Sequence, residues 1–309
     1  MVFNSQQKIQ FVRLYYYLKG TTKTKGLYTS NIIYLTMKSG IMLYSVADKF
    51  LEESIRAGSE TTTIYTEPIR FDPNKFVEMV KDKDLAITMH GPLRREDRGY
   101  VQEMVERLSP KVYAVTYDFP RKKIEKGIEV DFEKINEEFL SLKDFFEKQN
   151  VYFGLEDFPF EPSDLERIDE AVKNSPYYGM LLDIGHLNIR IIRSHYYRGL
   201  LELGHSNLRI VTSPDLSYEN LDVIIRNIPV PIMEVHVHDN KGEEDNHQYI
   251  GFGNNRFEDH ARALIKAGFN GVSSLEIDFK TEEQQIKAGE SLRIWKGLIE
   301  KYRSQSQPR

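Results

Sequence analysis

Residues 232–254 read IMEVHVHDNKGEEDNHQYIGFGN, an apolar run that breaks into imidazoles and carboxylates. The apolar start is typical of a buried strand. His236 and His238 are two residues apart, so on a strand both side chains point to the same face. The loop that follows adds three more candidate ligands: Asp239, Asp245 and His247. Imidazole nitrogens beside carboxylate oxygens are typical ligands of a divalent metal. The stretch therefore indicates a metal site at the end of a strand, with a polar surface loop as the alternative.

The composition restricts what kind of metal site this chain can build. The chain has 309 residues, 40% of them hydrophobic, which allows one large domain or two ordinary ones. It has no cysteine, so disulfides, thiolate nucleophiles and cysteine-based zinc sites are excluded, and any metal must bind to His, Asp and Glu. The net charge of −5 gives no general attraction to nucleic acid. We expect a cytoplasmic protein whose partner is a small molecule and not a membrane, with nucleic acid as the less favoured partner.

The first 40 residues differ from the rest of the chain. They contain six lysine or arginine residues and no acidic residue, the first of which is Asp48. Their apolar patches are short and interrupted, so they resemble neither a membrane span nor a secretory signal. We expect residues 1–40 to be a loosely ordered leader or an upstream extension, with Met37 or Met42 as alternative starts. Residues 41–303 are then the domain, and residues 304–309 a polar tail.

From residue 41 a pattern repeats about eight times: a short apolar run, a turn and a longer helical segment. The runs cover residues 41–46, 61–65, 85–90, 112–117, 151–156, 178–183, 232–236 and 272–277. The helical segments cover about 47–57, 73–80, 97–108, 131–149, 196–203, 218–226, 257–267 and 281–302, and one more starts near 162–164. Runs that are apolar on both faces fit strands buried between helices.

Strands that alternate with helices indicate βαβ units and a parallel sheet. Eight such units in about 260 residues match an α/β fold of the (β/α)8 TIM-barrel type in number and size. A doubly wound open sheet is the alternative. No Gly-x-Gly-x-x-Gly sequence follows the first run, so a dinucleotide-binding fold is not indicated.

Metal-binding residue types stand at the ends of five predicted strands. These are His90, Glu156, Asp183, His236 and Glu276. In a parallel barrel the carboxyl ends of all strands lie on one face, so these side chains converge. His186, Asp245 and His247 follow in loops on that face. Each residue alone has an ordinary explanation as a solvated strand end or a hydrogen-bonded core histidine, but together they predict a metal site. The remaining histidines are interpreted as surface residues: His195, His205 and His260.

Several short motifs in this order resemble the xylose isomerase-like TIM-barrel superfamily. They are Leu-Glu at 155–156, Leu-Asp-Ile-Gly-His at 182–186, His-Val-His-Asp-Asn-x-Gly at 236–242, Asp-x-His at 245–247, Ile-Gly-x-Gly at 250–253 and Leu-Glu at 275–276. The superfamily includes sugar and sugar phosphate isomerases and epimerases, ketose 3-epimerases, inosose dehydratases and endonuclease IV. The resemblance covers about residues 41–303.

The ketose 3-epimerase branch of this superfamily implies a particular ligand set. By position, one divalent metal (Mn2+, Mg2+, Co2+ or Zn2+) is held by Glu156, Asp183, His236 and Glu276. The resemblance also implies that Glu156 and Glu276 form the catalytic acid/base pair and that His186 contacts the substrate. His238 is then a substrate contact or a support for a ligand. The implied activity is isomerisation or epimerisation of a sugar, sugar phosphate or related polyol through a metal-stabilised enediolate, a role in carbohydrate metabolism.

Endonuclease IV resembles the chain at further positions, which makes a zinc phosphodiesterase acting on abasic DNA the alternative. His90, Asp245 and His247 match ligands of its three-zinc cluster. However, the fourth run, 112–117, carries no histidine, Glu156 is not followed by Asn-Thr, and Asp183 is not followed by Thr-Cys-His. A barrel that only binds a ligand is a third possibility, which the intact glutamate pair argues against. The long connection 187–230 is a candidate substrate lid or homo-oligomer contact.

Overall fold

The computed structural model describes residues 37–43, 48–65, 73–118, 120–124, 127–156, 167–202, 216–278 and 281–306. The chain divides into two units, Met1–Leu35 and Thr36–Arg309. All of the described residues belong to the second unit. Residues 1–36 of the expected leader lie outside them, whereas residues 38–40, also expected in the leader, belong to the first strand.

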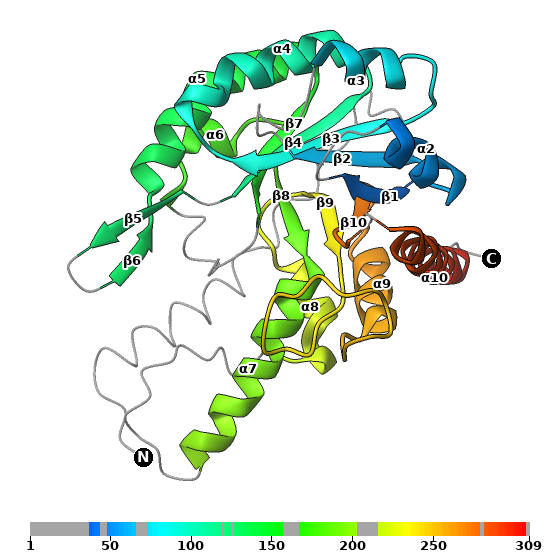
Figure 1. Ribbon diagram of the computed structural model, residues 1–309. Coiled ribbons are helices and arrows are strands. Elements are labelled where there is room, and N and C mark those ends of the chain that lie inside the picture. Colours follow the sequence, from blue (N-terminus) through cyan, green and yellow to red (C-terminus); the bar gives the residue numbers. More distant parts are fainter. Residues whose placement is uncertain are drawn as a thin grey trace. The chain divides into compact units, whose positions relative to one another are not determined.

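Eight parallel strands in the described part of the chain close into a barrel (Figure 1). They are β1 (Lys38–Leu43), β2 (Thr61–Tyr65), β3 (Ala86–Pro92), β4 (Val112–Asp118), β7 (Tyr152–Glu156), β8 (Tyr178–Asp183), β9 (Ile232–Val237) and β10 (Val272–Leu275). Their order around the barrel is β1-β10-β9-β8-β7-β4-β3-β2. Lys38 of β1 pairs with Val272 of β10 and closes the circle. The predicted (β/α)8 architecture is confirmed, and the open sheet is excluded.

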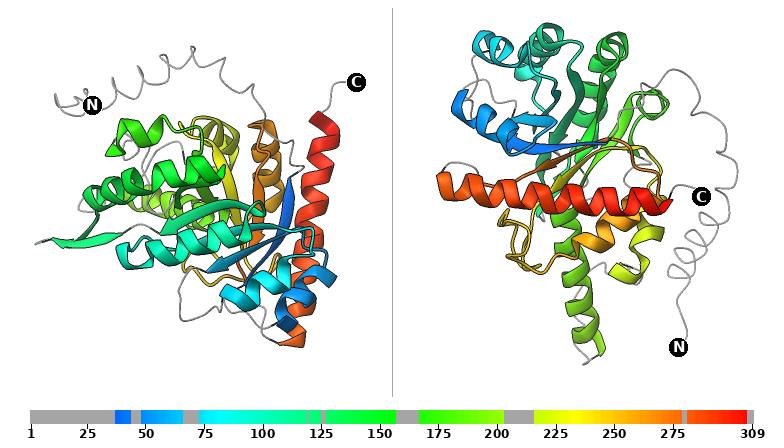
Figure 2. Two further views of the ribbon diagram at one scale, coloured as in Figure 1. Left: turned by 90° about the horizontal axis from the view of Figure 1, so that it is seen from above. Right: turned by 90° about the vertical axis from the view of Figure 1, so that its right-hand side faces the viewer.

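Helices follow the strands and cover the outside of the barrel (Figure 2). They are α2 (Asp48–Arg56), α3 (Pro73–Val80), α4 (Arg98–Leu108), α5 (Phe132–Gln149), α6 (Glu170–Lys173), α7 (Ile184–Glu202), α8 (Leu221–Arg226), α9 (Phe257–Lys266) and α10 (Glu282–Ser306), with the short 3-10 turns η2 (Arg95–Asp97) and η4 (Tyr218–Asn220). Of the helices that can be described, none is long and apolar enough to cross a membrane.

Two connections differ from the sequence prediction. A helix was expected at 196–203, but α7 begins at Ile184, directly after β8. An antiparallel hairpin, β5 (Arg121–Ile124) and β6 (Gly127–Val130), lies between β4 and α5, where the sequence predicts no strand. The helix start expected near 162–164 lies outside the described residues.

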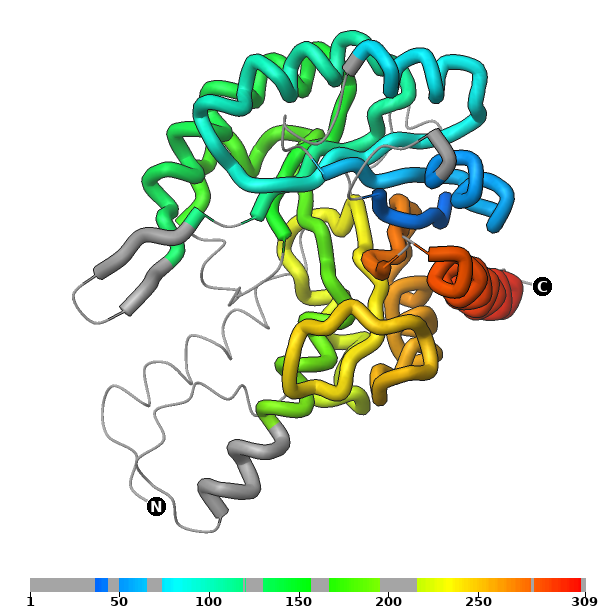
Figure 3. The backbone as a smooth tube through the Cα atoms, in the orientation of Figure 1, coloured from blue at the N-terminus to red at the C-terminus, as the bar shows by residue number. Residues whose placement is uncertain are grey.

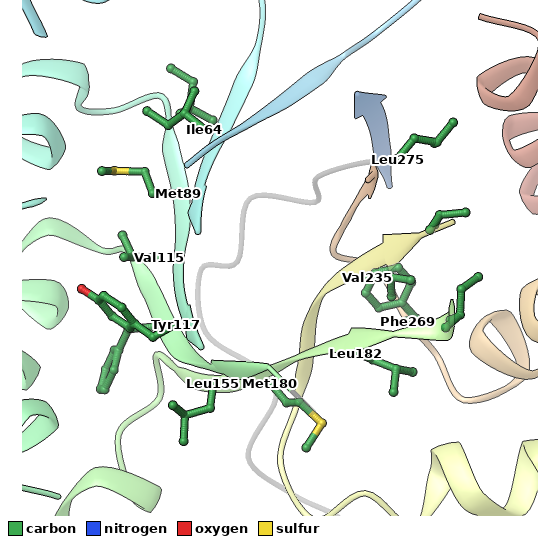
Figure 4. Packing of buried hydrophobic residues seen from close by; sticks show 14 of the residues in the cluster. Ile64, Met89, Val115, Tyr117, Leu155, Met180, Leu182, Val235, Phe269 and Leu275 are labelled. Carbon is green, nitrogen blue, oxygen red and sulfur yellow. The ribbon is translucent and has the colours of Figure 1, made fainter. Parts of the chain in front are cut away.

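The apolar core lies between the barrel and the helices. Side chains alternate along each strand between the barrel interior and the helical layer. The outward positions include Ile64, Met89 and Val115, each at most 1% exposed, and Figure 4 shows them pointing outward from their strands. Burying a side chain of this size stabilises the fold by about 1.5–3 kcal/mol. Trp295 of α10 is fully buried, and its Nε1 donates a hydrogen bond to Ser273 Oγ at 2.9 Å, which fixes α10 against β10.

The inward positions carry a buried polar layer. Thr63, Thr88 and Thr116 enter the barrel from three adjacent strands, and all three are fully buried, as is Glu234 of β9. The hydroxyls of Thr63 and Thr88 lie 2.6 Å apart, and Thr88 donates to Glu234 Oε1 at 2.6 Å. The expectation of runs apolar on both faces is therefore wrong at these positions. These side chains are small enough for the narrow interior. Their hydroxyl groups can be buried there because they hydrogen-bond to one another and to Glu234.

Candidate metal centre

Four side chains from neighbouring strands meet at the carboxyl end of the barrel. Glu156 and Asp183 are the last residues of β7 and β8, His236 is the penultimate residue of β9, and Glu276 directly follows β10. Glu156, Asp183 and His236 each place one ligand atom within 4.8 Å of the others. His236 Nδ1 lies 2.9 Å from Glu276 Oε2. The structure thus brings together the four residues expected as ligands, all at most 8% exposed.

Asp183 has a second task besides facing this cluster. Its Oδ1 accepts hydrogen bonds from the backbone N–H groups of Gly185 at 2.7 Å and His186 at 2.9 Å. These are free donors of the first turn of α7, so Asp183 caps the helix, and the positive end of the helix stabilises its charge. This cap explains why α7 starts directly after the strand. It also places His186 on a helix, whereas the sequence predicted it in a loop.

Charge balance within the cluster overcomes the cost of burial. Burial alone would raise the pKa of Glu276, but the neighbouring His236 and His247 hold that pKa well below its usual range. Burial would lower the pKa of His236, but Glu276 and Glu234 raise it well above the usual value. The pKa of Asp183 is lowered in the same way: His186 and His238 outweigh the effect of burial. Asp183 and Glu276 therefore keep their negative charge in a region with little solvent, which suits a cation.

The buried ring nitrogens also fit a metal. Within the described residues, neither ring nitrogen of His236 makes a hydrogen bond, and the same holds for Nε2 of His238. The close approach of His236 Nδ1 to Glu276 does not have hydrogen-bond geometry. Buried polar atoms without a partner need an explanation, because each one costs free energy. Imidazole and carboxylate donors converging on one point suit Zn2+, Mn2+, Co2+ or Mg2+, so the residues fit a divalent cation.

A second group adjoins the first and shares Glu156 with it. His90 Nε2 lies 3.1 Å from Asp118 Oδ1 and 3.6 Å from Glu156 Oε2. On the other side of the ring, His90 Nδ1 is 3.0 Å from Thr116 Oγ1. Asp118 also accepts a hydrogen bond from the Tyr65 hydroxyl at 3.3 Å. Asp118 is not among the residues predicted from the sequence, although it ends β4 just as Glu156 ends β7. It supplies a possible ligand at the strand that carries no histidine.

A third group lies on the side of the β9–α9 loop. His186 Nε2 is 3.0 Å from Asp245 Oδ2, and His247 Nε2 is 3.2 Å from the same oxygen. His238 Nε2 is 3.1 Å from Asp183 Oδ1 and 3.4 Å from Asp245 Oδ1. His247 has a left-handed backbone, with a φ of 45°, and its ring stacks on His238 at 4.4 Å. The five additional candidates, His90, His186, His238, Asp245 and His247, thus all border the four-residue cluster.

Asp239 does not face the cluster. Its carboxylate accepts four backbone N–H bonds, from Asn240, Gly251 and Gly253 at 2.9 Å and from Asn255 at 3.1 Å. Residues 239–255 therefore fold back on one buried side chain, and Figure 3 traces this loop in yellow to orange between β9 and α9. Asp239 holds the loop that carries Asp245 and His247.

His260 is a buried residue, and its interpretation as a surface residue is wrong. It lies on α9, is fully buried, and its ring packs edge-on against Tyr218 at 5.6 Å. Burial lowers its pKa to about 3, so it is neutral at pH 7. Its position on the inner face of an amphipathic helix, among Ala261, Ala263 and Leu264, was the signal in the sequence. The side chains of His195 and His205 lie outside the described part of the chain.

Comparison with known proteins agrees with this architecture. The family model described as xylose isomerase-like TIM barrel matches residues 53–297. An uncharacterised protein of Methanocaldococcus jannaschii, MJ1311, is 25% identical over 254 residues, which cover 73% of this chain and 75% of that protein.

Solved structures with the same fold include a D-tagatose 3-epimerase-like protein, with a TM-score of 0.62, 20% identity and coverage of 88% of this chain and 100% of the other. D-psicose 3-epimerase with D-tagatose, from Clostridium cellulolyticum H10, has a TM-score of 0.59 at 15% identity and covers 85% of this chain and 99% of its own. The IOLI protein with a bound zinc atom has a TM-score of 0.52 at 19% identity and covers 88% and 100%. With a family model that matches most of its length, the chain belongs to the xylose isomerase-like TIM-barrel family.

Proposed function

We propose that this protein is a divalent-metal-dependent isomerase or epimerase that acts on a sugar, sugar phosphate or related polyol in the cytoplasm. The observation that carries the proposal is the pair of buried glutamates, Glu156 and Glu276, on either side of Asp183 and His236. The structural neighbours described as sugar 3-epimerases support the substrate class. Glu156, Asp183, His236 and Glu276 would hold the cation.

The two glutamates supply the acid and base that such a reaction needs. When bound, a divalent cation polarises a substrate oxygen and makes the adjacent C–H bond more acidic. One glutamate carboxylate takes the proton from that carbon, and the bonding electrons move into the substrate's carbonyl group. The other glutamate, protonated, returns a proton to the opposite face and inverts the centre. His186 lies 3.2 Å from Glu156 and 3.0 Å from Asp245, and would orient a substrate hydroxyl.

Hydrogen–deuterium exchange tests this proposal most directly. The purified protein, loaded in turn with Mn2+, Mg2+, Co2+ or Zn2+, is incubated in D2O with a panel of ketoses and ketose phosphates. We expect deuterium at the carbon next to the carbonyl of at least one sugar, and Glu156→Gln and Glu276→Gln each to slow its incorporation by about a thousandfold. Glu283→Gln, an exposed change on α10, is the matched control. No incorporation into any sugar at saturating metal would contradict the proposal.

One observation favours a second candidate, a zinc phosphodiesterase. The groups His90–Asp118–Glu156 and His238–Asp245–His247 flank the four-residue cluster, and each has its ligand atoms within 4.8 Å of one another. Several metal ions side by side position a water molecule and stabilise both oxygens of a phosphoryl displacement. Metal content separates the candidates: one ion per chain supports the isomerase, whereas two or three zinc ions support the phosphodiesterase. Nicking of an abasic-site duplex that Glu276→Gln abolishes would favour the second.

A further inference from the structure

A fully buried glutamate lies in the barrel interior beneath the candidate metal centre. Glu234 stands on β9 two residues before His236, so both side chains enter the interior. Its exposed fraction is 0%. Burying a carboxylate costs several kcal/mol unless its surroundings pair it and satisfy its lone pairs. An apolar residue at this position of the barrel interior would avoid that cost. The partners of the Glu234 carboxylate therefore indicate what role the residue has.

The surroundings of Glu234 consist of hydroxyls and one imidazole. Thr88 donates to Oε1 at 2.6 Å, and the Thr63 hydroxyl lies 3.1 Å from the same oxygen. The Thr116 hydroxyl is 3.5 Å from Oε2. In the described part of the chain, Glu234 pairs with His236, whose Nε2 is 3.6 Å from Oε1. The basic group that faces this carboxylate there therefore belongs to the metal centre.

The two nitrogens of His236 point in different directions. Nδ1 lies 2.9 Å from Glu276 Oε2, at the metal centre, while Nε2 faces Glu234 below it. His90 is linked to the same carboxylate less directly, because its Nδ1 is 3.0 Å from Thr116 Oγ1 and that hydroxyl is 3.5 Å from Glu234 Oε2. A metal-binding histidine commonly donates its other N–H to a carboxylate, which fixes the tautomer and the orientation of the ring.

We propose that Glu234 is the positioning residue of the metal centre: it accepts the Nε2–H of His236 and thereby turns Nδ1 toward the cation. This inference rests on the metal centre of the proposed function. The separation of 3.6 Å exceeds a usual N–H···O hydrogen bond by about 0.6 Å, so a small rotation of the ring completes the bond. The threonine hydroxyls hold the carboxylate in place while it does so.

Metal affinity of a charge-neutral variant is the first test. Glu234→Gln keeps the shape of the side chain and removes its charge. We expect its dissociation constant for Mn2+ or Zn2+, measured by titration calorimetry without any sugar, to rise 10- to 100-fold. The control is Glu138→Gln, which alters another buried carboxylate, one paired with Arg98. It should lower the melting temperature and leave the affinity for metal unchanged. Equal metal affinity in Glu234→Gln and the unmodified chain would overturn the proposal.

A second measurement uses the unmodified chain and so does not depend on the folding of a variant. In zinc-loaded protein with 15N-labelled histidine, we expect His236 to show a metal-bound Nδ1 and a protonated, hydrogen-bonded Nε2. A metal-bound Nε2 would overturn the proposal. Both measurements are made without substrate, so a failure to exchange deuterium into sugars contradicts the proposed function alone. An unmodified chain that binds no divalent metal would contradict both.

Discussion

One of the buried histidines, His260, makes the acid stability of this protein testable. Burial lowers the pKa of His260 to about 3, below the value near 6.5 of an unfolded chain. Its contribution to stability is therefore fully present above pH 6.5 and is lost as the pH falls from there toward 3, since only the unfolded chain then binds the proton. Replacing His260 with phenylalanine removes this loss.

We expect the free energy of unfolding of His260→Phe to gain about 2 kcal/mol relative to the parent when the pH is lowered from 7 to 5. Urea unfolding in the presence of EDTA, which keeps metal release out of the comparison, measures it. Tyr218→Phe changes the ring that packs against His260 without adding or removing a group that titrates in this range. It should lower stability equally at both pH values. A constant difference between His260→Phe and the parent would show that His260 is not buried in its neutral form.

Glu234 and Asp118 could not be recognised as site residues from the sequence, and the physical reason is the same for both. His90, Glu156, Asp183, His236 and Glu276 stand out because each ends an apolar run. Glu234, in contrast, lies inside such a run, where a carboxylate looks like an interruption of the pattern. Its three hydroxyl partners come from other strands, and only the closed barrel brings them together. Asp118 ends its strand, but its meaning depends on His90 and Glu156 on the strands beside it.

At the scale of elements, the start of α7 depends on a glycine. A Cβ atom at Gly185 would lie 2.1 Å from His238 Cε1, closer than any real contact, so the first turn of α7 can sit against His238 only without a side chain there. We expect Gly185→Ala to displace His238 and Asp183 and to weaken metal binding at least tenfold, with a cost of about 1–3 kcal/mol from overpacking. Titration calorimetry and urea unfolding measure the two effects.

The matched control is Gly297→Ala in α10, where a Cβ atom meets nothing within 4 Å. There the gain in helix propensity should stabilise the protein by about 0.5–1 kcal/mol and leave metal binding unchanged. Equal metal affinity in both variants would mean that the packing of α7 on His238 does not shape the centre.

The β9–α9 loop depends on one carboxylate in a comparable way. Asp239 accepts four backbone N–H bonds, and Asp239→Ala leaves these donors to water or without a partner. We expect about 3 kcal/mol of destabilisation and faster amide hydrogen exchange across residues 239–255. Glu243→Gln, an exposed change in the same loop, should alter neither. Unchanged exchange in Asp239→Ala would show that the glycines and the bridge between Asp239 and Gln248 suffice to hold the loop.

At the scale of the whole molecule, much of the architecture follows from patterns that the chain carries locally. Each strand is a short apolar or β-branched run, and the alternation with helices allows few topologies. Two features of the structure do not follow from these local patterns. Asp183 both faces the metal centre and caps α7, so the helix starts twelve residues earlier than predicted at Ile184 rather than at 196. The polar interior layer escapes prediction because threonine favours strands whether it points inward or outward.

Metal binding should stabilise the whole barrel, because its expected ligands come from four consecutive strands. β7, β8 and β9 each contribute one residue and Glu276 directly follows β10, so a bound cation links half of the barrel. A ligand that binds only the folded state adds about 2.7 kcal/mol at one hundred times its dissociation constant. For a domain of this size we expect the melting temperature to rise by about 5–10 °C.

Asp183→Asn should abolish most of this rise. Amide hydrogen exchange should slow more in β7 to β10 than in β2 to β4, because the expected ligands of the cation lie at the ends of β7 to β10. Protection gained only in the loop 239–255 would place the ion at His238, Asp245 and His247 instead of at the strand ends. A rise that persists undiminished in Asp183→Asn would remove that aspartate from the ligand set and would contradict a cation bound between the two glutamates of the proposed proton transfer.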